Sequence, residues 1–184
     1  MSTTGADLSA MLPEMLPRLW AFALRISGDW HDAEDLVQRA CLRGLERAHQ
    51  LKPDTAALSW MFSIVHTIWV NELRARSVRN RSSMDWDDGF LETVEDKSTR
   101  TPEQLTMYAQ IIEAVQRLPE AQRVVMLLVA VEELSYSEAA EALNIPLGTV
   151  MSRLSRARQS IGAIFANKAS ASLKVPTYGE DCSS

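Results

Sequence analysis

Hydrophobic residues recur every three or four positions along most of the chain, the spacing that gathers them on one face of an α-helix. Three such segments lie in the first half of the chain, at 8–23, 33–48 and 58–73. Gly28 can end the first helix in a left-handed turn, and Asp29 or Asp32 can cap the start of the second. No segment alternates apolar and polar residues as a half-buried strand would. The pattern therefore predicts three packed helices in this half.

A second group of helices is predicted after residue 100. Thr101-Pro102-Glu103-Gln104 has the sequence of a helix start, with Thr as the cap, Pro in the first turn and Gln as the reciprocal capping partner. Residues 124–131 are apolar on almost every side, which predicts a buried central helix. Ser135 followed by Glu138 predicts a capping box and therefore the start of a further helix.

Residues 82–100 separate the two groups and show no helical periodicity. A cluster of seven acidic and two basic residues occupies 85–103, whereas basic residues without acids occupy 73–81 and 142–168. The small, polar residues at the end of the chain favour disorder. The prediction is an all-α fold of two small helical domains, 1–81 and 101–168, with an acidic extended linker at 82–100 and a disordered tail at 169–184.

Composition limits the class of protein. The chain has 184 residues and a net charge of −5, which argues against a general nucleic-acid binder. Its two cysteines, Cys41 and Cys182, fit no metal-binding spacing and no disulfide framework. The sequence has no secretory-signal pattern, and no apolar run reaches the ~18 residues that span a bilayer. We therefore expect a soluble, cytoplasmic protein with no metal and no cofactor.

The most informative segment comes after residue 135. Residues 136–143 are typical of a short capped helix, Asn144-Ile145-Pro146 of a tight turn, and 147–164 of a second helix with one apolar and one polar, basic face. A helix that enters the major groove needs this division, because one face packs on its partner helix and the other contacts bases and phosphates. A solvated basic face on an ordinary helical bundle would carry the same charges, but the cap and turn favour a helix-turn-helix. The candidate DNA contacts are Thr149, Ser152, Arg153, Ser155, Arg156 and Arg158.

Three motifs, taken in order, resemble one protein family. The residues at 148–158, GTVMSRLSRAR, are similar to the promoter-reading helix of bacterial sigma factors. The residues at 118–123, LPEAQR, are similar to the start of the same domain, and those at 32–38, DAEDLVQ, resemble the hallmark of the other sigma domain. The chain thus resembles the small extracytoplasmic-function (ECF) group over about residues 10–166. Met151 is a departure, because the family often has Lys or Arg there.

The resemblance implies a fold and a function. A sigma2-like domain would bind core RNA polymerase and the −10 promoter element, and a sigma4-like domain would bind the −35 element. Core polymerase would supply all catalysis, so the protein itself would be no enzyme. The resemblance also implies a stress- or signal-responsive regulon and control by an anti-sigma factor, often membrane-bound, which could hold the protein at the inner membrane face.

The family also implies surfaces on two predicted helices. The outer face of the second helix would dock on the clamp coiled coil of the polymerase, with the candidates Asp35, Gln38, Arg39, Leu42 and Arg43. The third helix and the loop at about 49–57 would hold unpaired −10 bases. Trp60 or Trp69 could stack on such a base, although the apolar spacing predicts that Trp69 is buried. The −10 candidates are Ser63, His66, Thr67, Asn71, Arg74 and Arg76.

Two other classes of protein are compatible with parts of the sequence. A stand-alone DNA-binding regulator would explain the helix-turn-helix but would leave residues 10–81 without a role, and it predicts a dimer. An enzyme would need chemistry from the cluster His31, Asp32, Glu34 and Asp35, whose spacing fits no metal-ligand motif. Acidic residues are also favoured electrostatically at a helix start, which explains this cluster without catalysis.

Overall fold

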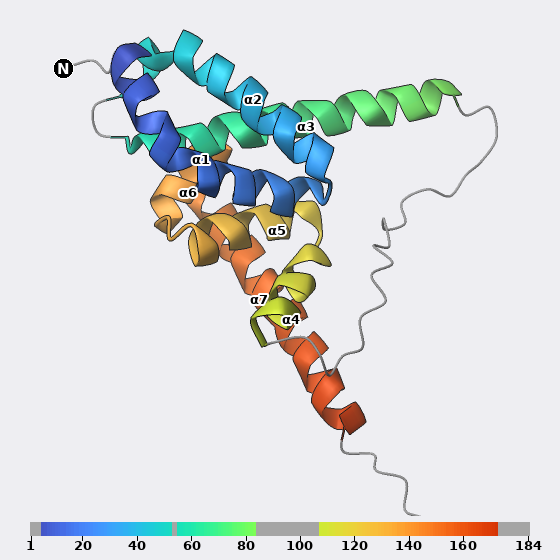
Figure 1. Ribbon diagram of the computed structural model, residues 1–184. Coiled ribbons are helices and arrows are strands. Elements are labelled where there is room, and N and C mark those ends of the chain that lie inside the picture. Colours follow the sequence, from blue (N-terminus) through green and yellow to red (C-terminus); the bar gives the residue numbers. More distant parts are fainter. Residues whose placement is uncertain (1–4, 53–54, 84–106, 173–184) are drawn as a thin grey trace, which may run out of the picture.

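The computed structural model describes residues 5–52, 55–83 and 107–172, and the regular structure within these ranges is entirely helical (Figure 1). The all-α prediction is therefore confirmed for the described part of the chain. Nearly all of the predicted acidic linker, the predicted cap at Thr101 and most of the predicted tail lie outside the described residues.

The first domain contains the helices α1 (Gly5–Ser27), α2 (Trp30–Glu46) and α3 (Ala57–Ser83), with a 3-10 turn at Ala48–Gln50. Gly28 ends α1 with φ at 72°, a left-handed conformation that glycine adopts without strain. Asp29 caps α2, because its side chain accepts a hydrogen bond from the backbone N–H of Asp32 at 2.9 Å. The predicted turn between α1 and α2 is confirmed, and of the two candidate caps Asp29 is the one used.

The second domain contains α4 (Met107–Gln116), α5 (Glu120–Met126), a π-helical turn at Leu127–Val131, α6 (Tyr136–Leu143) and α7 (Leu147–Ser172). The predicted capping box is confirmed: the Ser135 hydroxyl accepts from the Glu138 N–H at 3.2 Å, and the Glu138 carboxylate accepts from the Ser135 N–H at 2.8 Å. Asn144 ends α6 in the left-handed region, with φ at 51°.

The predicted buried helix at 124–131 differs in part from the structure. Residues 124–128 are buried, but the helix widens into a π-turn, and the Glu132 N–H donates to the Leu127 carbonyl five residues earlier, at 2.9 Å. A π-turn inserts an extra residue and so rotates the subsequent residues about the helix axis. Ala130 is exposed as a result, whereas Glu132 is 6% exposed.

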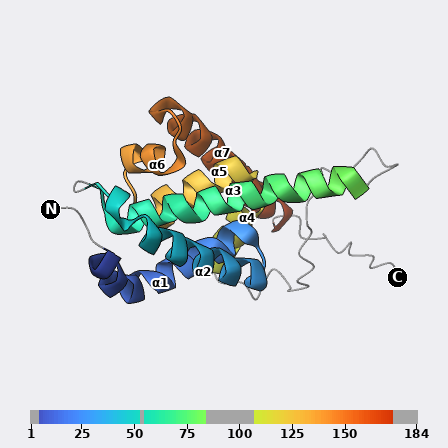
Figure 2. The ribbon, with the colours of Figure 1, turned by 90° about the horizontal axis from the view of Figure 1, so that it is seen from above.

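The two domains pack against each other. Helix α3 contacts α1 and α2 on one side and α6 on the other, and α1 also contacts α5 (Figure 2). The buried hydrophobic residues form one continuous cluster that includes Phe22 and Phe62 from the first domain and Leu127 and Leu154 from the second. The apolar surface buried between the domains therefore adds to the stability of this arrangement.

No helix in the described part of the chain has the length and hydropathy to cross a membrane.

Candidate nucleic-acid and protein interfaces

The helix-turn-helix is formed by α6, a turn and α7. Val150, Leu154 and Ala157 of α7 are buried with exposed fractions of 1% or less, so this stripe fixes the helix on the second domain. The polar face points outward: among the candidate DNA contacts Ser152, Ser155, Arg156 and Arg158 are exposed. Thr149 and Arg153 are half-buried. This division between a packed and a polar face is the one that a groove-reading helix requires.

Arg153 lies beside the first domain. It lines a cavity of about 230 Å³ together with His66 and Val70 of α3 and with Glu120 and Val124 of α5. Burial, and to a smaller extent the positive charge of Arg153, lower the pKa of His66 to about 4. The structure thus brings together two residues that the sequence analysis assigned to different promoter elements.

The −10 candidates lie along α3 in two groups. Thr67, Asn71 and Arg74 are exposed, whereas Ser63 and His66 are half-buried at the contact with the second domain. The Ser63 and Thr67 hydroxyls donate to carbonyls of their own helix, at 2.6 Å to Trp60 and 2.7 Å to Ser63. Such intrahelical bonds still leave the hydroxyl oxygen able to accept one.

The loop before α3 forms a second cavity, of about 220 Å³. Its walls come from both domains: Trp60 and Ser63 on α3, Lys52 from the loop, and Glu141 from α6. Lys52 Nζ lies 3.3 Å from a carboxylate oxygen of Glu141, and this exposed ion pair joins the two domains beside the cavity. Trp69 is 4% exposed, which confirms that it is buried, and Trp60 is half-buried at the cavity.

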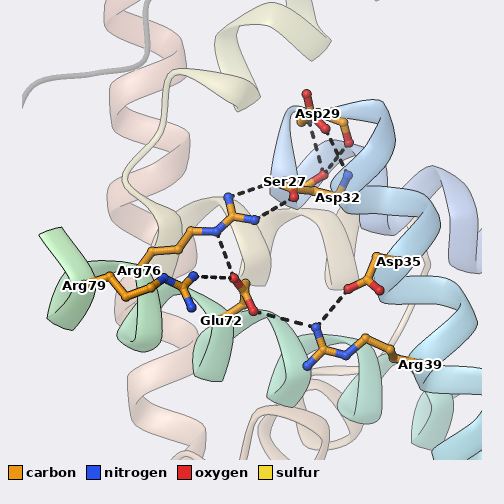
Figure 3. A network of polar contacts seen from close by, with 8 residues as sticks. All are labelled: Ser27, Asp29, Asp32, Asp35, Arg39, Glu72, Arg76 and Arg79. Atoms are coloured by element: carbon orange, nitrogen blue, oxygen red, sulfur yellow. Dashed lines mark hydrogen bonds and ion pairs between the residues drawn. The ribbon is translucent and has the colours of Figure 1, made fainter.

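Arg76 differs from the other −10 candidates because its guanidinium is bound by the protein (Figure 3). Its Nη1 and Nη2 donate to the two carboxylate oxygens of Asp32 at 2.8 and 2.6 Å, and its Nε donates to Glu72 at 3.1 Å. The guanidinium also lies over the Trp69 ring, 5.6 Å from its centroid. The hydrogen bonds that Arg76 donates to Asp32 lower the pKa of the Asp32 carboxyl and raise the pKa of Arg76. The Arg76 side chain therefore ties α3 to the start of α2.

Glu72 is a residue that the sequence analysis missed. Its carboxylate lies 3.1 Å from Arg76, 3.0 Å from Arg79 and 3.7 Å from Arg39, so it joins α2 to the basic end of α3 (Figure 3). Hydrogen bonds from Arg76 and Arg79 lower its pKa. The four-residue spacing from Glu72 to Arg76 is a local signal that could have found part of this network.

The polymerase candidates share the outer face of α2. Asp35, Gln38 and Arg39 are exposed, Arg43 is half-buried, and Leu42 is 64% exposed. Arg39 Nη1 donates to Asp35 at 2.9 Å. A large exposed apolar side chain among charged groups is suited to the centre of a protein contact, because its burial by a partner is favourable.

Family models match both domains. Residues 12–79 match sigma-70 region 2, and residues 108–161 match sigma-70 region 4. The chain is 30% identical to the ECF RNA polymerase sigma factor EcfG of Rhodopseudomonas palustris, over 81% of this chain and 80% of that protein. The chain belongs to the ECF RNA polymerase sigma factors. The expected family is therefore confirmed, and this sigma factor is a transcription initiation factor.

Other relatives agree with this assignment. The sigma factor is 31% identical to the sigma-E factor of Escherichia coli, over 71% of this chain and 72% of that protein. Its fold is similar to the sigma factor RpoE from Bartonella quintana, solved in complex with the anti-sigma factor NepR. The TM-score is 0.67 at 24% identity, with 87% of this chain and 97% of that chain covered.

Proposed function

We propose that this sigma factor binds core RNA polymerase through the outer face of α2 and directs it to promoters through two DNA contacts. Helix α7 binds the −35 element and α3 binds the −10 element, while core polymerase supplies all catalysis and no cofactor is needed. The observation that carries the proposal is the outward polar face of α7, where Ser152 and Arg156 are exposed opposite a buried stripe. A guanidinium group in the major groove can bind guanine through two hydrogen bonds.

Run-off transcription with core polymerase across genomic promoters tests this function. Arg156→Ala should lower −35-dependent initiation by about tenfold or more, the scale of one lost base contact, and should leave core binding unchanged. Arg117→Ala is the matched control, because Arg117 is an exposed arginine in the same domain but outside α7. Unchanged transcription with Arg156→Ala would refute the assignment of this contact.

The stand-alone regulator makes an opposite prediction. It would bind duplex DNA specifically as a dimer and would form no stable complex with core polymerase. A pull-down with purified core polymerase separates the two functions, and the absence of a complex together with specific duplex binding would reject the sigma function.

We further propose that this sigma factor acts in the cytoplasm on a stress- or signal-responsive regulon and that an anti-sigma factor, which can be anchored at the inner membrane face, controls it. The support is the fold shared with RpoE, which was solved bound to an anti-sigma factor. Co-purification from cells before and after stress should recover such a partner only from unstressed cells. Deletion of every candidate partner should raise the activity of the sigma factor in unstressed cells. Activity equal to that of the parent strain would contradict this control.

A further inference from the structure

Two large apolar side chains stand exposed at the start of α7. Leu147 is 48% exposed and Met151 is 53% exposed, although the buried stripe of the same helix runs through Val150 and Leu154. Leu147 and Met151 are four residues apart, so they are neighbours on one flank of the helix. Neither belongs to the hydrophobic cluster or to the partly buried residues packed on it. The two side chains therefore do not contribute to the hydrophobic core of the described fold.

This flank lies in the part of α7 that would contact DNA in a helix-turn-helix. In a helix-turn-helix, the residues in the first turns of the second helix contact base edges. Each residue advances about 100° around a helix of 3.6 residues per turn. Met151 therefore lies between the buried stripe and the exposed Ser152 and Ser155, on the opposite flank from Arg153. Because Arg153 lines the cavity against the first domain, the flank with Met151 is the more accessible of the two.

The chemistry of Met151 differs from that of its polar neighbours. A thioether donates no hydrogen bond, so it cannot grip guanine or a phosphate as an arginine does. The one apolar group that a base pair presents in the major groove is the 5-methyl of thymine. A flexible, polarisable Met side chain adapts readily to such a small apolar contact.

We propose that Met151, supported by Leu147 beside it, selects a thymine in the −35 element by packing on its 5-methyl group. Met151 is then a specificity-determining residue of this sigma factor. The inference rests on the proposed promoter function and adds to it the base that this flank of α7 recognises.

The test removes the methyl group alone. Once run-off transcription has defined the −35 element, each of its thymines on either strand is replaced singly by deoxyuridine, and holoenzyme binding is measured. At one position, deoxyuridine should weaken binding about fourfold, the worth of one buried methyl. Met151→Ala should weaken binding to the unmodified promoter by a similar factor and should bind the thymine and deoxyuridine promoters equally.

Two further variants act as controls. Met151→Leu keeps an apolar side chain and should keep the sensitivity to the methyl group. Ile111→Ala removes an apolar side chain that is 38% exposed on α4, in the same domain, and should change neither affinity nor methyl sensitivity. Because these residues are exposed, all three variants should fold like the parent protein, which thermal unfolding checks.

Different results would overturn the assignment to Met151 and the proposed promoter function. If the holoenzyme initiates transcription but no deoxyuridine changes binding, or Met151→Ala keeps the full sensitivity, the assignment to Met151 is overturned. An element without thymine on either strand overturns it as well. If the chain forms no holoenzyme, the proposed promoter function itself has failed.

Discussion

Arg18 of α1 and Glu132 of the second domain form a paired contact across 114 residues of sequence. Arg18 Nε donates to the Glu132 carboxylate at 2.9 Å, and Arg18 Nη2 donates to the Glu132 backbone carbonyl at 2.9 Å. The Glu132 side chain is 4% exposed, and Arg25 Nη1 is the next cation, 3.9 Å away. The π-turn before Glu132 gives the residue its inward direction, so a local irregularity of the helix serves the contact between domains.

Arg18→Ala should lower the free energy of unfolding by about 1–3 kcal/mol, because it leaves a buried carboxylate without its nearest donor. Thermal or urea unfolding measures the loss, and small-angle scattering reports whether the domains separate. Lys52→Ala is the matched control: it removes an interdomain ion pair that is exposed on both sides, and it should cost less than about 1 kcal/mol. Equal effects of the two substitutions would contradict the central role of Glu132.

Arg76→Ala and Arg74→Ala should affect different properties, stability and DNA binding respectively, although the two residues are close in sequence. Arg76 joins Asp32, Glu72 and the Trp69 ring, so its loss should lower stability by about 1–3 kcal/mol. Arg74 is exposed, so its loss should leave the melting temperature unchanged and weaken −10 binding. Thermal unfolding and binding to −10 DNA by the holoenzyme distinguish the two. A stable Arg76→Ala variant would show that the network contributes little.

The pairing of Asp32 with Arg76 predicts a dependence of stability on acid. Asp32 has a folded pKa below its ordinary value of 3.8, so the folded state favours the ionised carboxylate. Its contribution to stability is present above the unfolded pKa and is lost as the pH falls through the folded pKa. Urea unfolding between pH 5 and about 2 should therefore show a steeper loss of stability in the parent protein than in Asp32→Asn.

His66 predicts a second dependence at higher pH, with a different origin. Its pKa is about 4 in the folded protein against an ordinary value of 6.5, because burial between the domains disfavours the charged ring. Between those values the unfolded state binds more protons, so stability rises with pH from about 4 to about 6.5. His66→Gln should flatten the curve in this range only. An NMR titration of His66 with a midpoint near 6.5 in the folded parent protein would contradict the burial.

The local features of the fold could be predicted from sequence, because their signals lie within a few residues. The left-handed Gly28, the cap at Asp29 and the capping box of Ser135 with Glu138 each depend on neighbours in the chain. Trp69 was correctly predicted to be buried from apolar spacing. The family could be inferred from three short motifs in the right order, and the family models confirm it.

The contacts between distant segments could not be predicted in the same way. No local signal links Arg18 to Glu132, and the π-turn that directs Glu132 inward interrupts a segment that reads as one apolar helix. Arg76 belongs to a run of arginines that is typical of a DNA-binding segment. Its guanidinium instead forms hydrogen bonds with Asp32, 44 residues earlier in the chain. The sequence assigned His66 and Arg153 to separate DNA contacts, and only the packing of the domains places them around one cavity.

Arg153, a proposed −35 contact, lies where the two domains meet and lines one cavity with His66. If a −35 duplex has to separate α3 from α7 to contact Arg153, the free energy of the domain contact is subtracted from the affinity of the free protein for −35 DNA. A partner that holds the domains apart would then remove this cost and raise the affinity for −35 DNA. Because coupling between two binding sites is reciprocal, promoter DNA would then raise the affinity of that partner for the sigma factor by the same factor.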